Sequence, residues 1–489
     1  MSTASSATKK KFLNIFIALV IFLVIRIFLP VGNGLSDRGV TVLATFISTI
    51  WLWIFVGVDW PSLLVPGILI VTGVLPQNTM LAVSFGNFCF AYVLATMLIN
   101  VALESTGVIE QVALWFISRK ICKGRPWVFL GMFLLSCVVV EFFLDCVPVT
   151  IIYLSMADRI CQRLGYEKGS LFGKALVVSI LWLVVIPYGS TPISHPGAVL
   201  MIGFLNEVGI SISFMQYMAI GVPFSLLAWA VTMLILRFLV QPDFSKFADY
   251  DPEEMRKEMK PLDTKAKVSL SIFLLVILVW LMPDILGGIA PSVALYFKTT
   301  VALVAPPILG AAILCIVHIG DNPILDLKRD LYKIPLTTLI FIVGIQSFAT
   351  ALTDPDIGVS VFLGNLFAPL AQSVSSNMLM WIAMLLTIVL TQFMSNIVVI
   401  NLVWAAFLPV FAAVNMAGGN INIAAFGVIL VLTANTAFIF PSSYVCAPMC
   451  YTSGYLEVKD GIKYGLPAVI SFYLLLMLLF YPLSNLILV

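Results

Sequence analysis

Long apolar runs recur from one end of the chain to the other, and they constrain the fold more than any other feature. Each is about 17–25 residues long, the length that lets a helix cross the hydrocarbon core of a bilayer. Only 10% of the residues are charged, whereas a soluble domain has about 25%. The sequence therefore predicts an all-α polytopic membrane protein with about 11 transmembrane helices. The clearest runs lie near 12–31, 39–57, 61–77, 84–104, 214–240, 267–287, 296–317, 334–352 and 466–488.

Charge and motif content exclude several classes of function. The net charge is only +2 and the basic residues are scattered over loops, so we expect no nucleic acid partner. Two histidines are too few for a histidine-rich metal site. The chain has no P-loop, HExxH motif or nucleophile elbow in a plausible context. We therefore expect no enzyme, no cofactor and no metal beyond sodium, with Na+ or H+ as the coupling ion.

The distribution of Lys and Arg predicts how the chain threads through the cell membrane, because cytoplasmic loops are enriched in these residues. Placing all the basic clusters inside forces 126–160 and 376–410 each to enter and leave on the same side. The first is then a re-entrant hairpin from the cytoplasm and the second a re-entrant hairpin from outside. The N-terminus comes out cytoplasmic and the C-terminus extracellular. The basic clusters are Lys9–Lys11, Arg119–Arg125, Arg159–Lys174, the segment 241–267, Lys328–Lys333 and Lys459–Lys463.

Two apolar regions that are broken by Gly, Pro and polar residues share one pattern. FFLDCVPV (142–149) aligns with QFMSNIVV (392–399), and ISHPGAV (193–199) aligns with SYVCAPM (443–449). Two similar halves that enter from opposite faces form an inverted repeat, and their interrupted segments mark a transport site near the midplane. The predicted organisation is a first helix in 1–38, a first repeat in 39–240 with hairpin 126–160 and broken helix 173–206, a cytoplasmic linker in 241–266, and a second repeat in 267–489 with hairpin 376–410 and broken helix 424–456.

The hairpin tips carry the chemistry. Ser395 and Asn396 lie at the predicted second tip, where helix ends leave N–H groups free and carry partial positive charge. Such N–H groups, with an amide and a hydroxyl, suit a carboxylate or sulfate, and the carbonyls at the same break suit a sodium ion. Alternatively, the two residues only cap a packed hairpin.

The broken helices add two further polar clusters. Dense Pro and Gly unwind a helix and free its carbonyls, and Ser and Thr hydroxyls can bind those carbonyls without any ion present. That simpler reading does not explain why the clusters occur in both halves. The first cluster contains Ser190, Thr191, Ser194, His195 and Pro196, and the second contains Thr436, Ser442, Ser443 and Tyr444.

At these residues the chain resembles the divalent anion/sodium symporters, which carry dicarboxylates, citrate or sulfate. Members have a Ser-Asn-Thr motif at each hairpin tip, facing a loop that often reads Thr-Pro-Pro-Asn. Here the second tip keeps Ser395 and Asn396 but has Ile397, and the first tip has Asp145-Cys146-Val147 instead. The facing loops read Ser194-His195-Pro196-Gly197 and Tyr444-Val445-Cys446-Ala447, while Pro441 and SGYL (453–456) fit the flanks.

The resemblance implies a homodimer in which a transport domain moves against a scaffold domain, as an elevator. It implies carboxylate contacts at Asn396 and sodium sites between each tip and its loop. The expected substrate-binding residues are Asp145, Cys146, Ser194, His195, Pro196, Ser395, Asn396, Ser443 and Tyr444. The expected cation-binding residues are Asp145, Ser190, Thr191, Ser395, Thr436 and Ser442.

Asp145 is the sharpest departure from the family pattern, because a carboxylate in the membrane interior is costly and functional by default. Four roles stay open. It ligates a cation, it carries a proton, it pairs with His195, or it caps a helix. Glu141, one turn earlier, is a second carboxyl with no assigned partner.

We therefore expect a secondary active transporter of a small organic dianion such as succinate, malate or fumarate, driven by a cation gradient or by exchange. Citrate, sulfate or another oxyanion is the alternative substrate. A cation/proton antiporter of related architecture, with the cation bound at Asp145, is a competing class.

Overall fold

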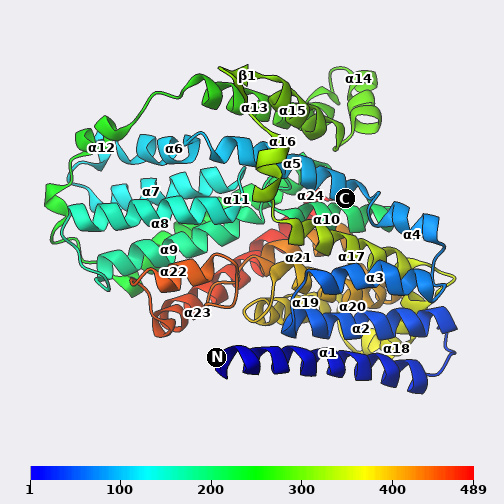
Figure 1. The fold of residues 1–489 in the computed structure, drawn as a ribbon. Helices are drawn as coiled ribbons and strands as arrows, with labels where there is room; N and C mark the ends of the chain where they lie inside the picture. Colours follow the sequence, from blue (N-terminus) through cyan, green and yellow to red (C-terminus); the bar gives the residue numbers. More distant parts are fainter. Residues whose placement is uncertain (1, 489) are drawn as a thin grey trace.

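The computed structural model describes residues 2–488, with the side chains of 2–7, 249 and 367–373 left out, and it is almost entirely helical (Figure 1). Met1 and Val489, the outer ends of the predicted organisation, lie outside the described residues. The helices of the first half are α1 (Ser2–Phe28), α2 (Asp37–Phe55), α3 (Trp60–Val71), α4 (Gln77–Val83), α5 (Phe88–Glu104), α6 (Val108–Ile117), η1 (Lys120–Cys122), α7 (Pro126–Glu141), α8 (Cys146–Arg163), α9 (Leu171–Tyr188), α10 (Pro196–Glu207), α11 (Phe214–Ile235) and η2 (Leu236–Val240).

The second half has a similar succession of elements and one short strand pair. Its elements are η3 (Phe247–Asp249), α12 (Pro252–Glu258), α13 (Thr264–Leu286), α14 (Pro291–Tyr296), η4 (Phe297–Val301), α15 (Ala305–Ile316), β1 (His318–Ile319), β2 (Asn322–Pro323), α16 (Leu327–Asp330), η5 (Leu331–Lys333), α17 (Leu336–Thr353), α18 (Val359–Ser373), α19 (Ser376–Leu390), α20 (Asn396–Met416), α21 (Ile423–Ala434), α22 (Ala447–Thr452), α23 (Val458–Leu475), η6 (Leu476–Phe480) and α24 (Tyr481–Ile487). β1 and β2 are antiparallel.

Nine helices in the described part of the chain are long and apolar enough to cross a membrane, or up to ten if the bent pair Pro291–Val301 and Ala305–Ile316 counts as one span. The sequence predicted about 11. One difference lies at 61–77, where α3 has only 12 residues and is about 18 Å long. Gly73, with φ +68°, turns the chain after α3 because its backbone adopts the left-handed region. The other lies at 296–317, where the pair is bent by 70°.

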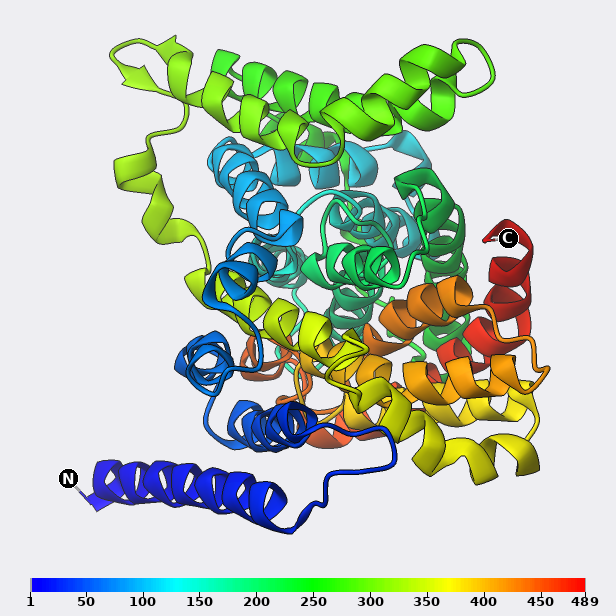
Figure 2. The same ribbon diagram turned by 90° about the vertical axis from the view of Figure 1, so that its right-hand side faces the viewer.

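Two groups of helices form opposite edges of the molecule. α1 lies along one edge and packs against α2, while α13, α14 and α15 form a layer at the other edge (Figure 2). Both edges expose large apolar side chains, among them Phe16 and Phe28 on α1 and Leu275 and Leu309 on the opposite layer. Such surfaces suit a lipid environment, where apolar side chains face hydrocarbon.

α7 and α8 form a helical hairpin with its tip at 142–145. The Tyr153 hydroxyl donates a hydrogen bond of 2.8 Å to Ser136 Oγ, and these two residues lie at nearly equal distances along the chain from the tip. Both helices also pack against α9. The fold therefore brings the tip of the hairpin to the end of α9.

α19 and α20 form the corresponding pair in the second half, with their break at 391–395. Both helices pack against α21. α20 has 21 residues and is long and apolar enough to cross a membrane by itself. An arm that crosses only half of the bilayer would be shorter than α20. The re-entrant geometry expected for 376–410 stays a prediction.

Contacts between the halves are reciprocal, because each pairing of helices occurs twice with the roles of the two halves exchanged. α5 packs on α15 while α17 packs on α3, and α10 packs on α21 while α22 packs on α9. Each half therefore contributes an element that the other half needs as a packing partner.

The segment 241–266, predicted as a linker between the halves, is partly helical and packs against the first half of the chain. The Tyr250 hydroxyl donates to the Ile117 carbonyl (2.8 Å), and the Lys246 N–H donates to the Tyr166 hydroxyl (3.1 Å). Phe247, Tyr250 and Met255 are buried. These three buried side chains give α12 and the residues before it an inner face, which the high charge of this segment concealed.

A half-buried ion pair joins α9 to α23, and its loss is expected to destabilise the fold. Lys174 Nζ lies 2.9 Å from Asp460 Oδ2, with the two side chains 14% and 5% exposed. Removing one partner of a buried pair costs about 3–5 kcal/mol, so Asp460→Asn is expected to cost about 3 kcal/mol given the partial exposure. Thermal unfolding of the detergent-purified protein measures this.

Lys459→Gln is the matched control, because Lys459 pairs with Glu457 in a position where the side chains are 73% and 62% exposed. Exposed pairs contribute about 0–1 kcal/mol. Equal losses of stability in the two variants would contradict a structural role for the Lys174–Asp460 pair.

Candidate functional site

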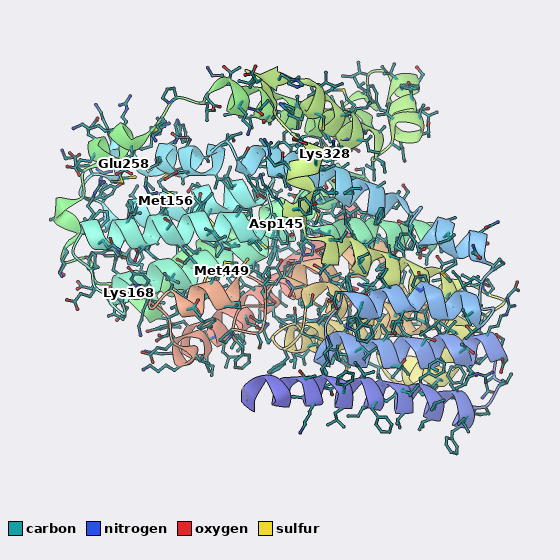
Figure 3. The ribbon with its side chains drawn as sticks, in the orientation of Figure 1. Asp145, Met156, Lys168, Glu258, Lys328 and Met449 are labelled. Atoms are coloured by element: carbon teal, nitrogen blue, oxygen red, sulfur yellow. The ribbon has the colours of Figure 1, made fainter. Side chains whose placement is uncertain are left out.

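The first hairpin tip is fastened to the break between α9 and α10. Asp145 is the N-cap residue of α8, and its Oδ1 accepts a hydrogen bond of 3.0 Å from the Val147 N–H. Its Oδ2 accepts a bond of 2.9 Å from the Tyr188 hydroxyl at the end of α9. The Thr191 hydroxyl donates to the Phe142 carbonyl at 2.6 Å. Asp145 lies near the centre of the molecule, while Lys168 and Glu258 lie toward one end (Figure 3).

Hydroxyl groups bind the polar groups freed where the helix breaks at 189–195. Ser194 Oγ donates to the Tyr188 carbonyl (3.0 Å), and the Tyr217 hydroxyl donates to the Gly189 carbonyl (2.9 Å). Ser190 Oγ lies 2.6 Å from Ser225 Oγ. The predicted cation ligands Ser190 and Thr191 are thus wholly buried and already hydrogen-bonded within the protein.

His195 contacts Tyr188 rather than Asp145. The two rings stand edge to face with centroids 4.5 Å apart, and Nδ1 of the imidazole has no hydrogen-bond partner among the described residues. No ion pair joins His195 to Asp145 in the described part of the chain, and the carboxylate accepts its hydrogen bond from the Tyr188 hydroxyl.

Asp145 and the first broken helix face a small cavity of about 20 Å³. That volume holds about one water molecule. Thr96 and Asn100 on α5 complete its polar lining, together with Ser194, His195 and Pro196 from the predicted set. The cavity therefore lies between the first hairpin tip, its loop and α5.

Gln392 fastens the second hairpin tip to the break after α21. Its Nε2 donates to the Thr436 carbonyl (2.9 Å), and its Oε1 accepts from the N–H groups of Phe438 (3.2 Å) and Ile439 (3.1 Å). One buried amide thus binds three backbone groups of the unwound segment.

Asn396 makes the second set of hydrogen bonds that hold this tip in place. Its Nδ2 donates to Asn435 Oδ1 at 3.1 Å, and its Oδ1 accepts from the Thr391 hydroxyl at 3.0 Å. The Ala434 carbonyl lies 2.7 Å from the same hydroxyl and competes with Asn396 Oδ1 for its one proton. Thr436, by contrast, donates within its own turn to the Thr433 carbonyl.

Ser395 and Ser442 are the exposed hydroxyls of the second site. Ser395 is the N-cap residue of α20, and its side chain makes no capping hydrogen bond. Ser443 is buried and donates to the Phe440 carbonyl at 2.7 Å. The N-terminus of α20 is thus open where that of α8 is capped by a carboxylate.

The two halves of the site touch each other. Gly189 lies so close to the Asn435 side chain that a Cβ at position 189 would overlap the carboxamide. Cys146 Sγ lies 3.6 Å from the Tyr444 hydroxyl, and the Tyr444 and Tyr188 rings lie 6.3 Å apart. The two hairpin tips and the two unwound segments that face them therefore form one continuous network, which links Asp145 to Asn396.

The sequence placed Asp145, Cys146, Ser395 and Asn396 at helix breaks, and the structure brings Asp145, Cys146 and Asn396 to the network, while Ser395 is exposed at the adjoining N-terminus of α20. The sequence did not assign roles to Tyr188, Thr391, Gln392 and Asn435, whose hydrogen bonds hold each tip against its unwound segment. Gln392 stood out as an amide in an apolar stretch and was a usable signal. Tyr188 had none, because a tyrosine at the end of an apolar helix is usually part of the packing.

Comparisons with known proteins identify the fold and family. The YdaH transporter of Alcanivorax borkumensis, a crystal structure, superposes with a TM-score of 0.58 at 12% identity over 83% of this chain and 88% of that one. A sodium-dependent dicarboxylate transporter of Staphylococcus saprophyticus is 23% identical over 91% of this chain and 86% of its own. A membrane protein of Cupriavidus necator is 23% identical over 94% and 90%.

The model of the sodium:sulfate symporter transmembrane region matches residues 9–486. Because that match covers nearly the whole chain, the protein belongs to this family of symporters, whose members are transporters and not enzymes.

Proposed function

We propose that the protein is a secondary active transporter that carries a small carboxylate across the cell membrane together with a cation. A C4-dicarboxylate such as succinate, malate or fumarate is the proposed substrate, and sodium is the proposed coupling ion. The name of the family supports sodium as the coupling ion, and the sodium-dependent dicarboxylate transporter of Staphylococcus saprophyticus supports both assignments.

The open N-terminus of α20 carries the proposal. The first-turn N–H groups there have no side-chain cap, and helix N-termini attract anions through these groups and the helix dipole. The exposed hydroxyl of Ser395 and the second N–H of the Asn396 amide add donors at the same end. A substrate carboxylate would bind here, in contact with the break at 391–395.

A cation near Asp145 would offset the charge of the substrate. The carboxylate keeps lone pairs beyond the two that bind Val147 and Tyr188, and it faces the cavity that it shares with Ser194 and Asn100. Oxygen atoms of this kind, with carbonyls of an unwound helix, suit a sodium ion. We place the second cation between Ser395, Thr436 and Ser442.

An elevator mechanism in a homodimer, with inverted repeats at 39–240 and 267–489, belongs to the same proposal. The reciprocal contacts of the two halves and the contact between Gly189 and Asn435 in the two unwound segments support it. The apolar outer edges at α1 and α13–α15 fit a scaffold that stays in the bilayer.

Sulfate or another oxyanion is the second candidate substrate, because the matching family model describes a sodium:sulfate symporter. Neutral hydrogen-bond donors at a helix end suit a tetrahedral oxyanion as well as a carboxylate.

Uptake by proteoliposomes tests the proposal. We expect labelled succinate uptake to rise at least about tenfold when an inward sodium gradient replaces an equal potassium gradient, the effect of about 1.4 kcal/mol of driving force. Sulfate and citrate are measured in parallel and separate the two candidate substrates. Sodium or proton flux with no uptake of any anion would make the protein a cation/proton antiporter and overturn the proposal.

A further inference from the structure

Glu141 is a buried carboxyl group that the proposed substrate and cation sites leave unused. It is the last residue of α7, directly before the first hairpin tip. Its side chain is 0% exposed, and neither Oε1 nor Oε2 has a hydrogen-bond partner among the described residues. A carboxyl that a fold buries without any partner needs an explanation.

The groups around Glu141 supply no positive charge. The titratable groups that interact with Glu141 come from every element packed around the tip. They are Cys137 on α7, Asp145 at the tip, Cys146 and Tyr153 on α8, Tyr188 on α9, and Cys446 before α22. All six are acids or neutral donors. An ionised carboxylate enclosed by them would cost several kcal/mol more than the neutral acid.

The residue that corresponds to Glu141 in the second hairpin does have hydrogen-bond partners. Alignment of the two tips pairs Glu141 with Thr391, and the Thr391 hydroxyl lies within hydrogen-bond distance of two acceptors, Asn396 Oδ1 and the Ala434 carbonyl. A neutral hydroxyl there is sufficient to fasten a tip. The carboxyl group at 141 makes no such bond, so it serves a purpose other than fastening.

We propose that Glu141 is a proton-binding site whose occupancy is linked to docking of the first hairpin tip. The proton is held while the tip lies against Tyr188, Thr191 and Tyr444 and closes the carboxyl group off from water. When the tip moves away, water reaches the group, and an ordinary glutamic acid ionises at neutral pH. Each closing then takes up one proton and each opening releases one.

Linkage sets the direction of the pH effect. The docked state binds more protons than the undocked state, so acid favours docking and alkali favours opening. If the loaded carrier crosses the membrane with the tip docked and the empty carrier returns with the tip open, one proton enters with each substrate. This proton would travel in addition to the coupling ion, and the coupling step rests on the proposed transport function.

Infrared spectroscopy of the purified protein tests proton binding without any transport. In sodium-free buffer at neutral pH, we expect the carbonyl stretching band of a protonated carboxylic acid in the wild type, and its loss in Glu141→Gln. Glu110→Gln is the matched control, since Glu110 lies at the surface in an ion pair with Arg159, and the band is expected to persist there. A wild-type spectrum with no band assignable to Glu141, or one in which Glu141 is an ionised carboxylate that responds to sodium, overturns the proposal.

Proteoliposomes that contain a pH-sensitive dye test the coupling. Addition of a transported anion is expected to acidify the interior in the wild type, and Glu141→Gln is expected to reduce that signal at least about tenfold relative to anion uptake. Equal acidification per anion in both proteins would refute the coupling while leaving the transport proposal intact. If no anion is taken up by the wild type, the transport proposal fails, and the infrared measurement still decides whether Glu141 holds a proton.

Discussion

Replacing Asn396 by alanine is expected to reduce anion uptake about 100-fold, a free-energy effect of about 2.7 kcal/mol. The change leaves the buried Oδ1 of Asn435 without its donor, and a buried polar atom that loses its partner costs about 1–3 kcal/mol. It also removes an amide N–H from the open end of α20, where we place the substrate carboxylate. Initial uptake rates in proteoliposomes, normalised to the amount of inserted protein, measure the effect.

Asn401→Ala is the matched control for this prediction. Asn401 lies on the same helix and is also buried, but its amide donates only to the carbonyl of Ile397 in the preceding turn. The control variant is expected to retain uptake within about threefold, because the removed bond is local to one helix turn. Similar losses in both variants would mean that α20 tolerates no substitution, and the assignment of Asn396 to the site would then be wrong.

Gly221→Ala is expected to destabilise the protein by about 3 kcal/mol, at the upper end of the cost of overpacking. In an ordinary helix interior the same change stabilises by about 1 kcal/mol. Here the added Cβ would overlap the Ser190 carbonyl in the first unwound segment, and backbone atoms cannot rotate away. Because Ser190 adjoins Thr191, the displacement is also expected to weaken the bond that fastens Phe142.

Gly67→Ala supplies the comparison, since Gly67 lies inside α3 and a Cβ there meets no atom within 4 Å. It is expected to be neutral or slightly stabilising. Thermal unfolding in detergent compares the two variants. A Gly221→Ala protein as stable as the wild type would show that α11 and the first unwound segment do not pack as closely as described.

The positions of the helix breaks were predictable from local sequence. Dense Pro and Gly marked 187–196, and polar residues inside apolar stretches marked 145 and 395–396, because membrane-embedded backbone must be paired unless it is buried in protein or lines a cavity. The family motif then indicated which broken helix faces each tip. These are local signals, and each can be recognised within about ten residues of sequence.

The fastening bonds were not predictable in the same way. Tyr188 and Asn435 acquire their roles from partners 43 and 39 residues away in the chain, and nothing in their immediate neighbourhood indicates which partner they meet. Pairing of Asp145 with His195 was one of four roles left open, and in the structure Asp145 accepts hydrogen bonds from Val147 and Tyr188 instead. The 12-residue length of α3 depended on a single glycine, Gly73, at a position where hydropathy alone continues the run.

The network that links the two tips consists of amides, hydroxyls, one thiol and one carboxylate, and none of the side chains assigned to it is a lysine or an arginine. A hydrogen bond to a charged group contributes about 1.5–3 kcal/mol, so neutral donors suffice to hold an anion. The positive charge opposite a bound anion would then come from the coupling cation in the proposed function, so that binding of the anion and binding of the cation would be tied to each other.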